Sequence, residues 1–154
     1  MIRQMMALTH LAFGFLTALF SIQFLHPKNQ ILFLILVMFG SLLPDLDHPR
    51  SKLGRKTKVL AWLFQHRGFM HSIYAVIIMF MLSRLIFWNA IYVWALPLGY
   101  LSHLVSDSFS KEGIMFFHPL SKAKLRGIVR TGSSAEYIIL LILFFLGTWK
   151  LLLI

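Results

Sequence analysis

Long apolar stretches separated by short polar segments dominate the chain. Apolar runs cover residues 5–25, 30–43, 72–88, 90–105 and 136–154. A helix that crosses the hydrocarbon core of a bilayer needs about 20 such residues. The pattern therefore predicts five hydrophobic helices, of which the second is short.

The polar stretches between these runs predict where the helices end. Pro44 is poorly tolerated inside a helix and pushes Leu43 away from helical geometry, so the second helix should break there. Residues 51–58 are typical of a solvated loop, and 59–66 of a short amphipathic segment on the membrane surface. The third and fourth helices should form a hairpin that turns near residues 83–89.

Composition places the chain among integral membrane proteins. It is 58% hydrophobic with a mean hydropathy of +0.77 over 154 residues, which is too apolar for a soluble domain of this size. The first run is longer than the apolar part of a signal peptide and no small-x-small cleavage site follows it, so we expect a membrane helix. The prediction is one all-α domain over 1–154, a helical bundle in the membrane. The absence of cysteine excludes disulfides and thiolate metal ligands.

The net charge of +10 comes from basic residues that gather on one predicted side of the membrane. This distribution does not indicate a nucleic-acid-binding surface. Eleven basic residues lie in two segments: Arg50, Lys52, Arg55, Lys56, Lys58 and Arg67 in the first, and Lys111, Lys122, Lys124, Arg126 and Arg130 in the second. The connections on the opposite side carry only Lys28 and Arg84. The positive-inside rule then puts the N-terminus and both basic segments in the cytoplasm, as a multi-pass membrane protein that meets anionic lipid headgroups. We expect no nucleic-acid partner.

Histidines and aspartates gather at the same predicted membrane face. They are His10, Asp45, Asp47, His48, His66, His71, His103, Asp107 and His118, six of the seven histidines and all three aspartates. Ionisable residues beside membrane spans are costly, so a functional site is the default hypothesis. His103 and Asp107 are four residues apart on a predicted helix and therefore point to one place. With Asp45, Asp47 and His71 they suit a divalent metal, and His with Asp favours zinc, manganese or iron over magnesium or calcium.

Each of these residues also has an ordinary interpretation. His10 alone fits an interfacial residue, and Asp45 and Asp47 beside a proline fit turn formers. His26, His48 and His118 fit loop residues near prolines. The metal hypothesis depends on the conjunction of the His103–Asp107 pair with the aspartates and His71 at one face.

Five motifs together resemble the bacterial LexA-regulated, membrane-bound metal-dependent hydrolase family. They are THLAFG at 9–14, GSLLPDLDHPRS at 40–51, HRGFMHS at 66–72, GYLSHLVSDSFSKEGIMFFHPLS at 99–121 and TGSSAE at 131–136. The resemblance covers most of the chain. It implies a membrane-embedded metal-dependent hydrolase of the bacterial inner membrane.

The ligand order is also similar to that of the zinc-dependent phospholipase C and single-strand nuclease superfamily. This second resemblance implies that His10, Asp45 or Asp47, His71, His103 and a bridging Asp107 hold two ions, zinc or manganese. His66 or the other aspartate would complete the second ion. His118 and Glu136 are the candidates for a third metal, for which the match is poor.

Two metal ions held together favour hydrolysis of a phosphoester, here of a membrane lipid at the cytoplasmic interface. The catalytic candidates are Asp107, His66, Glu136 and Arg67; Arg67 is either a phosphate clamp or a plain topology charge. A metal-ion or proton-coupled transporter also fits intramembrane His and Asp, although paired broken repeats are missing. A non-catalytic protein that binds anionic lipid or a partner explains the basic residues but not the histidines.

Overall fold

The computed structural model describes residues 7–47, 68–88 and 90–153, except for the side chains of Leu46 and Asp47. Its α-helices are α1 (Ala7–Leu25), α2 (Gln30–Gly40), α4 (Ile73–Ile86), α5 (Ala95–Ser108) and α6 (Ser134–Leu151). Three 3-10 helices accompany them: η1 (Leu43–Asp47), η2 (Phe69–His71) and η3 (Tyr92–Trp94). The described ranges contain two isolated β-bridges and no strand, which confirms the all-helical prediction. The predicted amphipathic segment 59–66 and loop 51–58 lie outside the described residues.

Each predicted run corresponds to one α-helix, although α5 extends to Ser108 and α6 starts at Ser134, both beyond their predicted runs. Two other boundaries differ for local reasons. The second helix ends at Gly40 instead of residue 43, and the chain continues as the 3-10 turn η1 around Pro44. The fourth begins as η3, and its α-helix starts only at Ala95. Pro97 then falls in the first turn of α5, where backbone N–H groups have no intrahelical acceptor.

Two of the described helices are long and apolar enough to cross a membrane. They are α1 and α6, whereas α2 and α4 are apolar but shorter. The integral bundle is therefore supported in part, and a five-span topology remains a prediction.

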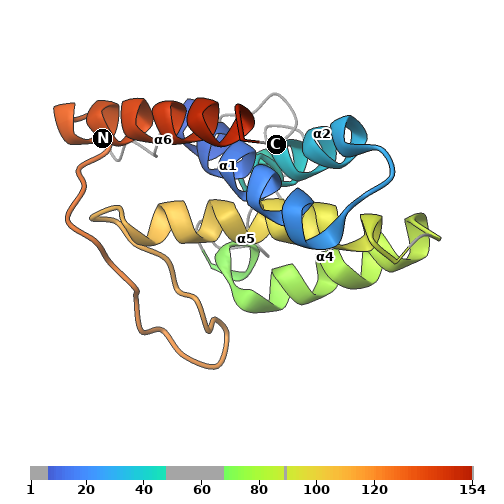
Figure 1. Cartoon of the computed structure of the whole chain (residues 1–154). Helices are drawn as coiled ribbons and strands as arrows, with labels where there is room; N and C mark the ends of the chain where they lie inside the picture. The colour runs from blue at the N-terminus through green and yellow to red at the C-terminus, as the bar shows by residue number, and fades with distance from the viewer. Residues whose placement is uncertain (1–6, 48–67, 89, 154) are drawn as a thin grey trace.

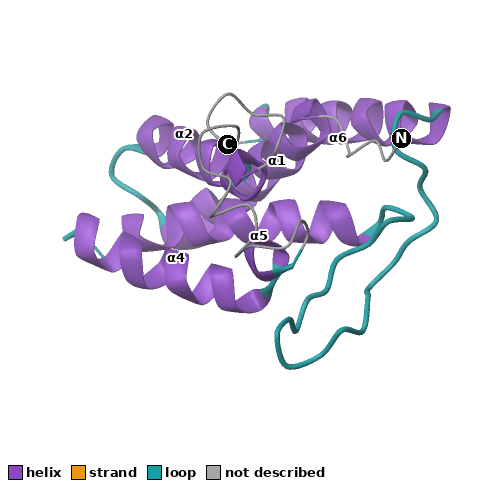
Figure 2. Ribbon diagram, turned by 180° about the vertical axis from the view of Figure 1, so that it is seen from behind, coloured by secondary structure: helices purple, strands orange, loops and turns teal. Residues whose placement is uncertain are grey.

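Helix α5 is the centre of the bundle. It contacts α1, α2 and α4, and α1 in turn contacts α2 and α6; Figures 1 and 2 show α5 between α4 on one side and α1 and α2 on the other. Ten of its residues are buried, including Gly99, Tyr100, His103, Ser106 and Asp107. The face formed by Leu98, Leu101, Val105 and Ser108 is half-buried or exposed, so neighbouring helices enclose α5 on most but not all of its surface.

Glycines allow α2 and α5 to approach closely. A Cβ atom on Gly99 would lie 2.0 Å from the carbonyl oxygen of Val37, and one on Gly40 would lie 2.5 Å from the carbonyl oxygen of Leu96. No side chain fits at either place, so the two backbones are in direct contact, as in small-residue helix packing within membranes. This contact brings Ser41, just after α2, against α5.

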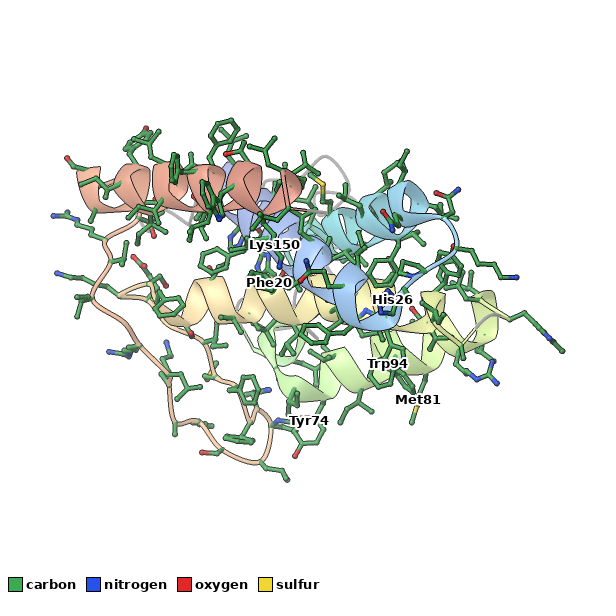
Figure 3. All side chains as sticks on the ribbon, viewed as in Figure 1. Phe20, His26, Tyr74, Met81, Trp94 and Lys150 are labelled. Carbon is green, nitrogen blue, oxygen red and sulfur yellow. The ribbon has the colours of Figure 1, made fainter. Side chains whose placement is uncertain are left out.

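The outer surface of the helices is apolar. Large side chains such as Met81 on α4 and Trp149 on α6 are 60% and 59% exposed, and Figure 3 shows Met81 projecting away from the bundle. An apolar surface this extensive is expected where lipid is the solvent. Lys150, near the end of α6, bonds the side chain of Gln23 and lies 4.6 Å from the ring centre of Phe20.

The helices alternate in direction, so one end of the bundle collects the starts of α1, α4 and α6 and the ends of α2 and α5 (Figure 1). The long connection 109–133 lies at this end and folds back on itself through the bridges Ser110–Val129 and Ile114–Leu125. Its basic residues, Lys111, Lys122, Lys124, Arg126 and Arg130, are all exposed. At the opposite end, His26 and Lys28 follow α1, and Arg84 lies in the last turn of α4.

Candidate metal centre

Five side chains from four elements meet at the end of the bundle described above. They are His10 on α1, Asp45 on η1, His71 on η2, and His103 and Asp107 on α5. Ligand atoms of His10, Asp45 and His103 lie within 4.8 Å of one another, and so do those of His71, His103 and Asp107. The helix spacing of His103 and Asp107 does direct both to one point, as predicted from the sequence.

Both carboxylates lie between His10 on one side and the His71–His103 pair on the other. Asp45 Oδ1 and Asp107 Oδ2 approach the Nε2 atoms of His71 and His103 at 3.6–3.8 Å. The other two oxygens, Asp45 Oδ2 and Asp107 Oδ1, approach Nε2 of His10 at 4.0 and 3.7 Å. Each carboxylate thus presents one oxygen to the His71–His103 side and the other to His10.

The cluster is almost completely buried from solvent. The side chains of the three histidines and of Asp107 are 0–2% exposed, and that of Asp45 is 23% exposed. Ionised groups this deeply buried require a partner of opposite charge. Asp45 forms the accessible side of the site.

Hydrogen bonds fix which nitrogen of His103 carries the proton. Its Nδ1 lies 2.8 Å from the carbonyl oxygen of Ser41. A carbonyl oxygen only accepts, so Nδ1 must donate, and in the neutral ring Nε2 then carries a lone pair. That Nε2 faces the carboxylates of Asp45 and Asp107.

The same reasoning applies to His10 through a serine. Ser106 donates its hydroxyl hydrogen to the carbonyl oxygen of His103 at 2.9 Å, so its oxygen is left to accept from Nδ1 of His10 at 2.5 Å. The neutral His10 ring therefore also turns the lone pair of Nε2 toward the two carboxylates. Ser106 joins the two histidines into one hydrogen-bonded unit.

Lone pairs that face carboxylate oxygens repel unless a cation lies between them. The separations of 3.6–4.0 Å are too long for direct hydrogen bonds. Two ligands of one zinc ion with bonds of about 2.0–2.2 Å are separated by roughly 3.3–3.6 Å. The cluster is a few tenths of an ångström wider than this, so His10, Asp45, His71, His103 and Asp107 fit a divalent metal with little contraction.

The remaining predicted residues do not all join the cluster. Glu136 is buried and accepts hydrogen bonds from Thr9 Oγ1 at 3.1 Å and from the backbone N–H of Gly132 at 2.6 Å. It ties the start of α6 to α1 beside His10, which is a positioning role. His118 lies in the connection 109–133 and belongs to neither ligand group. His48, His66, Arg67 and the side chain of Asp47 lie outside the described residues.

Three residues that support the cluster were missed in the sequence. Ser41 and Ser106 orient His103 and His10, and Tyr100 donates its hydroxyl hydrogen to the carbonyl oxygen of Met70 at 2.6 Å, next to His71. Serine carries no metal signal of its own. Only the i, i+3 spacing of His103 and Ser106 hinted that this hydroxyl faces the site.

The comparisons with known proteins agree on a membrane family. The model of the family described as YdjM inner membrane protein matches residues 5–153. Protein YvsG of Bacillus subtilis is 34% identical over 106 residues, 66% of this chain and 66% of that protein. Inner membrane protein YdjM of Escherichia coli is 34% identical over 122 residues, 70% of this chain and 61% of that protein. The match thus spans less than two thirds of either relative, and no solved structure matches the chain.

Proposed function

The chain belongs to the YdjM family of bacterial inner membrane proteins, and on that premise we propose that it is a metal-dependent hydrolase of a membrane lipid. The observation that carries the proposal is the orientation of His10 and His103. Both rings direct a lone pair at the carboxylates of Asp45 and Asp107, an arrangement that a divalent metal stabilises.

Two ions fit the division of the carboxylate oxygens better than one. His71 and His103 with one oxygen each of Asp45 and Asp107 would hold the first ion. His10 with the other two oxygens would hold the second. Zinc is the expected metal and manganese the alternative, since imidazole and carboxylate ligands suit both.

A pair of divalent ions held by these residues would supply Lewis acidity, which polarises a phosphoryl oxygen and lowers the pKa of water toward neutral pH. The chain's own residues provide the rest. Asp107 is closed off from solvent, while Asp45 borders the accessible side, where water and substrate enter. In the reaction, water adds to phosphorus, and the ester oxygen leaves as an alcohol after it takes up a proton.

The position of the cluster supports a lipid substrate. The cluster lies at one end of an apolar bundle, and in a bilayer this end would meet the headgroup phosphates of one leaflet. The connection 109–133 lies at this end and carries exposed basic residues, including Lys122, Lys124 and Arg126, which would attract anionic headgroups. By the positive-inside rule this leaflet is the cytoplasmic one. The substrate phosphate then never has to leave the membrane surface.

Transport of an ion through the bundle is disfavoured by its core. A polar cavity of about 530 Å³ does exist at the opposite end, lined in part by Gln23, His26 and Gln30. Between the two ends lies an apolar cluster that includes Ala18, Ile22, Phe33, Val37 and Ala95, each 0–4% exposed. An ion passing through this layer would have no ligand. The hydrolase is therefore preferred over a transporter.

The test uses protein purified in detergent and loaded with zinc or manganese. Release of phosphate or of a soluble headgroup from short-chain phospholipid and from phosphatidic acid is measured for wild type, His103→Ala and His26→Ala. We expect metal-dependent turnover that His103→Ala abolishes and that His26→Ala, the histidine at the opposite end, leaves intact. If no phosphoester is cleaved with either metal, or if His103→Ala cleaves as fast as wild type, the proposal fails.

A further inference from the structure

The connection 109–133 is a folded element and more than a link between α5 and α6. Its two sides pair through the backbone, where Ile114 and Leu125 exchange both of their N–H to carbonyl hydrogen bonds at 2.9 Å. At the far end, the N–H of Ser121 donates to the carbonyl oxygen of Phe117 at 3.0 Å and closes a turn. The connection therefore displays its side chains from a hydrogen-bonded backbone.

The part of the connection 109–133 next to the helices is anchored in the bundle. Ile114 is 1% exposed and belongs to a buried cluster with Tyr100 and Leu104, against which Phe116 also packs. The N–H of Ile73, the first residue of α4, donates to the carbonyl oxygen of Phe116 at 2.9 Å. These contacts fix the direction in which the connection leaves the bundle.

The connection 109–133 runs across the helix axes instead of along them. Figures 1 and 2 show it leaving the end of α5 and passing beyond α4 on the side away from α6, and along the helix axes it reaches no farther than the start of α6. Helix α6 has 18 residues and is apolar enough to cross a membrane. At a rise of about 1.5 Å per residue it is about 27 Å long, close to the thickness of a hydrocarbon core. A membrane that α6 spans therefore has its surface at the start of this helix, with the connection in the headgroup layer.

The exposed side chains of this connection combine large apolar groups with cations. Leu120 and Ile128 are 81% and 88% exposed. Three exposed cations lie between them in the sequence: Lys122, Lys124 and Arg126. Residues 113–133 contain no acidic residue. Apolar side chains interspersed with cations are typical of segments that lie in the interface of an anionic membrane, where the apolar groups reach the acyl chains and the cations stay at the phosphates.

We propose that the connection 109–133 docks on the leaflet beside the bundle, with Leu120 and Ile128 inserted below the headgroups. The three cations between them then bind the phosphates of anionic lipids. A second copy of the connection is a poorer occupant, because it carries the same cations and like charges disfavour the contact. This membrane contact goes beyond the proposed hydrolysis and does not rest on it.

The test is spin labelling of the full chain, which has no cysteine of its own, so that each introduced cysteine carries the single label. Leu120→Cys and Ile128→Cys are labelled in nanodiscs of phosphatidylcholine and phosphatidylglycerol. Accessibility of the label to oxygen, which dissolves in lipid, is compared with accessibility to a water-soluble nickel complex. Leu141→Cys on α6 is the lipid reference, and Lys28→Cys after α1 is the aqueous reference. All four side chains are exposed, so folding is not at risk.

We expect the ratio of oxygen to nickel accessibility at Leu120→Cys and Ile128→Cys to be several-fold higher than at Lys28→Cys and lower than at Leu141→Cys. The ratio at both positions of the connection should fall in nanodiscs of phosphatidylcholine alone, because the cations then meet no net negative charge. A ratio as low as that of Lys28→Cys would overturn the proposal. So would low accessibility to both reagents, which would show that protein covers the connection, and so would equal ratios in the two membranes.

Discussion

The ring of His10 stacks on the ring of His103, with centroids 3.8 Å apart and planes inclined by 14°. Two imidazolium cations would repel in such a stack inside a buried site. Neutral rings are therefore favoured, and neutral rings are what metal ligation requires. The stack favours neutral rings, and in a neutral ring the Ser106 hydrogen bonds place the lone pair of His10 on Nε2.

Ser106 should control metal affinity without touching the metal. In Ser106→Ala the Nδ1–H of His10 loses its acceptor, and we expect affinity for zinc to fall by about 10–100-fold. Ser106→Thr should restore most of it. Ser102, one turn earlier, is also buried and donates to a backbone carbonyl, that of Gly99, at 2.7 Å. Competition titration with a chromophoric chelator would measure this, and equal affinities for Ser106→Ala and Ser102→Ala would contradict the assigned role.

The Asp107→Asn variant should show whether the Asp107 carboxylate holds one metal ion or two. The amide keeps the shape of the side chain but removes the charge that holds two cations together, so metal content should fall from two ions per chain to one or none. Turnover should fall by several orders of magnitude. Glu112→Gln is the matched control, since this carboxylate belongs to neither ligand group and accepts a 3.4 Å hydrogen bond from Thr131. Elemental analysis that finds two ions in Asp107→Asn would show that this aspartate does not bridge.

Metal removal should lower thermal stability through the same ligands. An ion that binds only the folded chain stabilises it by about 2.7 kcal/mol at a free concentration 100 times its Kd. A chelator should therefore lower the Tm of wild type and have a much smaller effect on a His71→Ala, His103→Ala double variant. Identical shifts in the two proteins would place the metal elsewhere.

The sequence predicted the structure correctly where helix periodicity determines the direction of a side chain. Helix geometry alone brings His103 and Asp107 to one point, and Pro44 alone ends α2 early. The supporting contacts depend on residues far apart in the chain. His103 needs the carbonyl of Ser41, which is 62 residues away, and that carbonyl is in place because Gly99 lets α2 approach α5. No local pattern encodes such a pairing.

For Glu136, the superfamily resemblance implied a third metal or a catalytic role, and the structure adds contacts that suit a positioning role. A carboxylate near a predicted helix start matched a catalytic or metal role, but both of its oxygens accept hydrogen bonds, from Thr9 and Gly132. We predict that Glu136→Gln keeps most of the activity, because an amide still accepts from Gly132 and donates to Thr9. Glu136→Ala should destabilise the fold by about 1–3 kcal/mol by leaving these donors unpaired. Denaturation and turnover measured on both variants test this prediction. Full loss of turnover in a stable Glu136→Gln variant would support the catalytic role instead.

The closest helix contact should be the least tolerant of a methyl group. In Gly99→Ala the new Cβ would lie 2.0 Å from the carbonyl oxygen of Val37, a backbone atom that cannot rotate away, whereas in Gly147→Ala it would meet only the ring of Phe15 at 2.9 Å. Gly99→Ala should cost about 1–3 kcal/mol or more as the helices separate, and metal affinity should fall with it because Ser41 moves away from His103. Gly147→Ala should cost less and leave metal affinity unchanged, since it lies outside the α2–α5 contact. Thermal melts with and without zinc measure both effects, and equal losses in the two variants would refute the assignment of the α2–α5 contact as the support of the site.

The end of the bundle that carries the metal cluster should face the cytoplasm. The exposed basic residues of the connection 109–133 lie at this end, while Lys28 lies at the other, and an excess of Lys and Arg marks the cytoplasmic side. Green fluorescent protein fused after Lys124 should fluoresce, and alkaline phosphatase at the same position should be inactive. Fusions after Lys28 should give the reverse pattern if α1 spans the membrane, as its length allows. Active phosphatase after Lys124 would invert the topology and move the proposed lipid substrate to the outer leaflet, because the cluster and this connection share one end of the bundle.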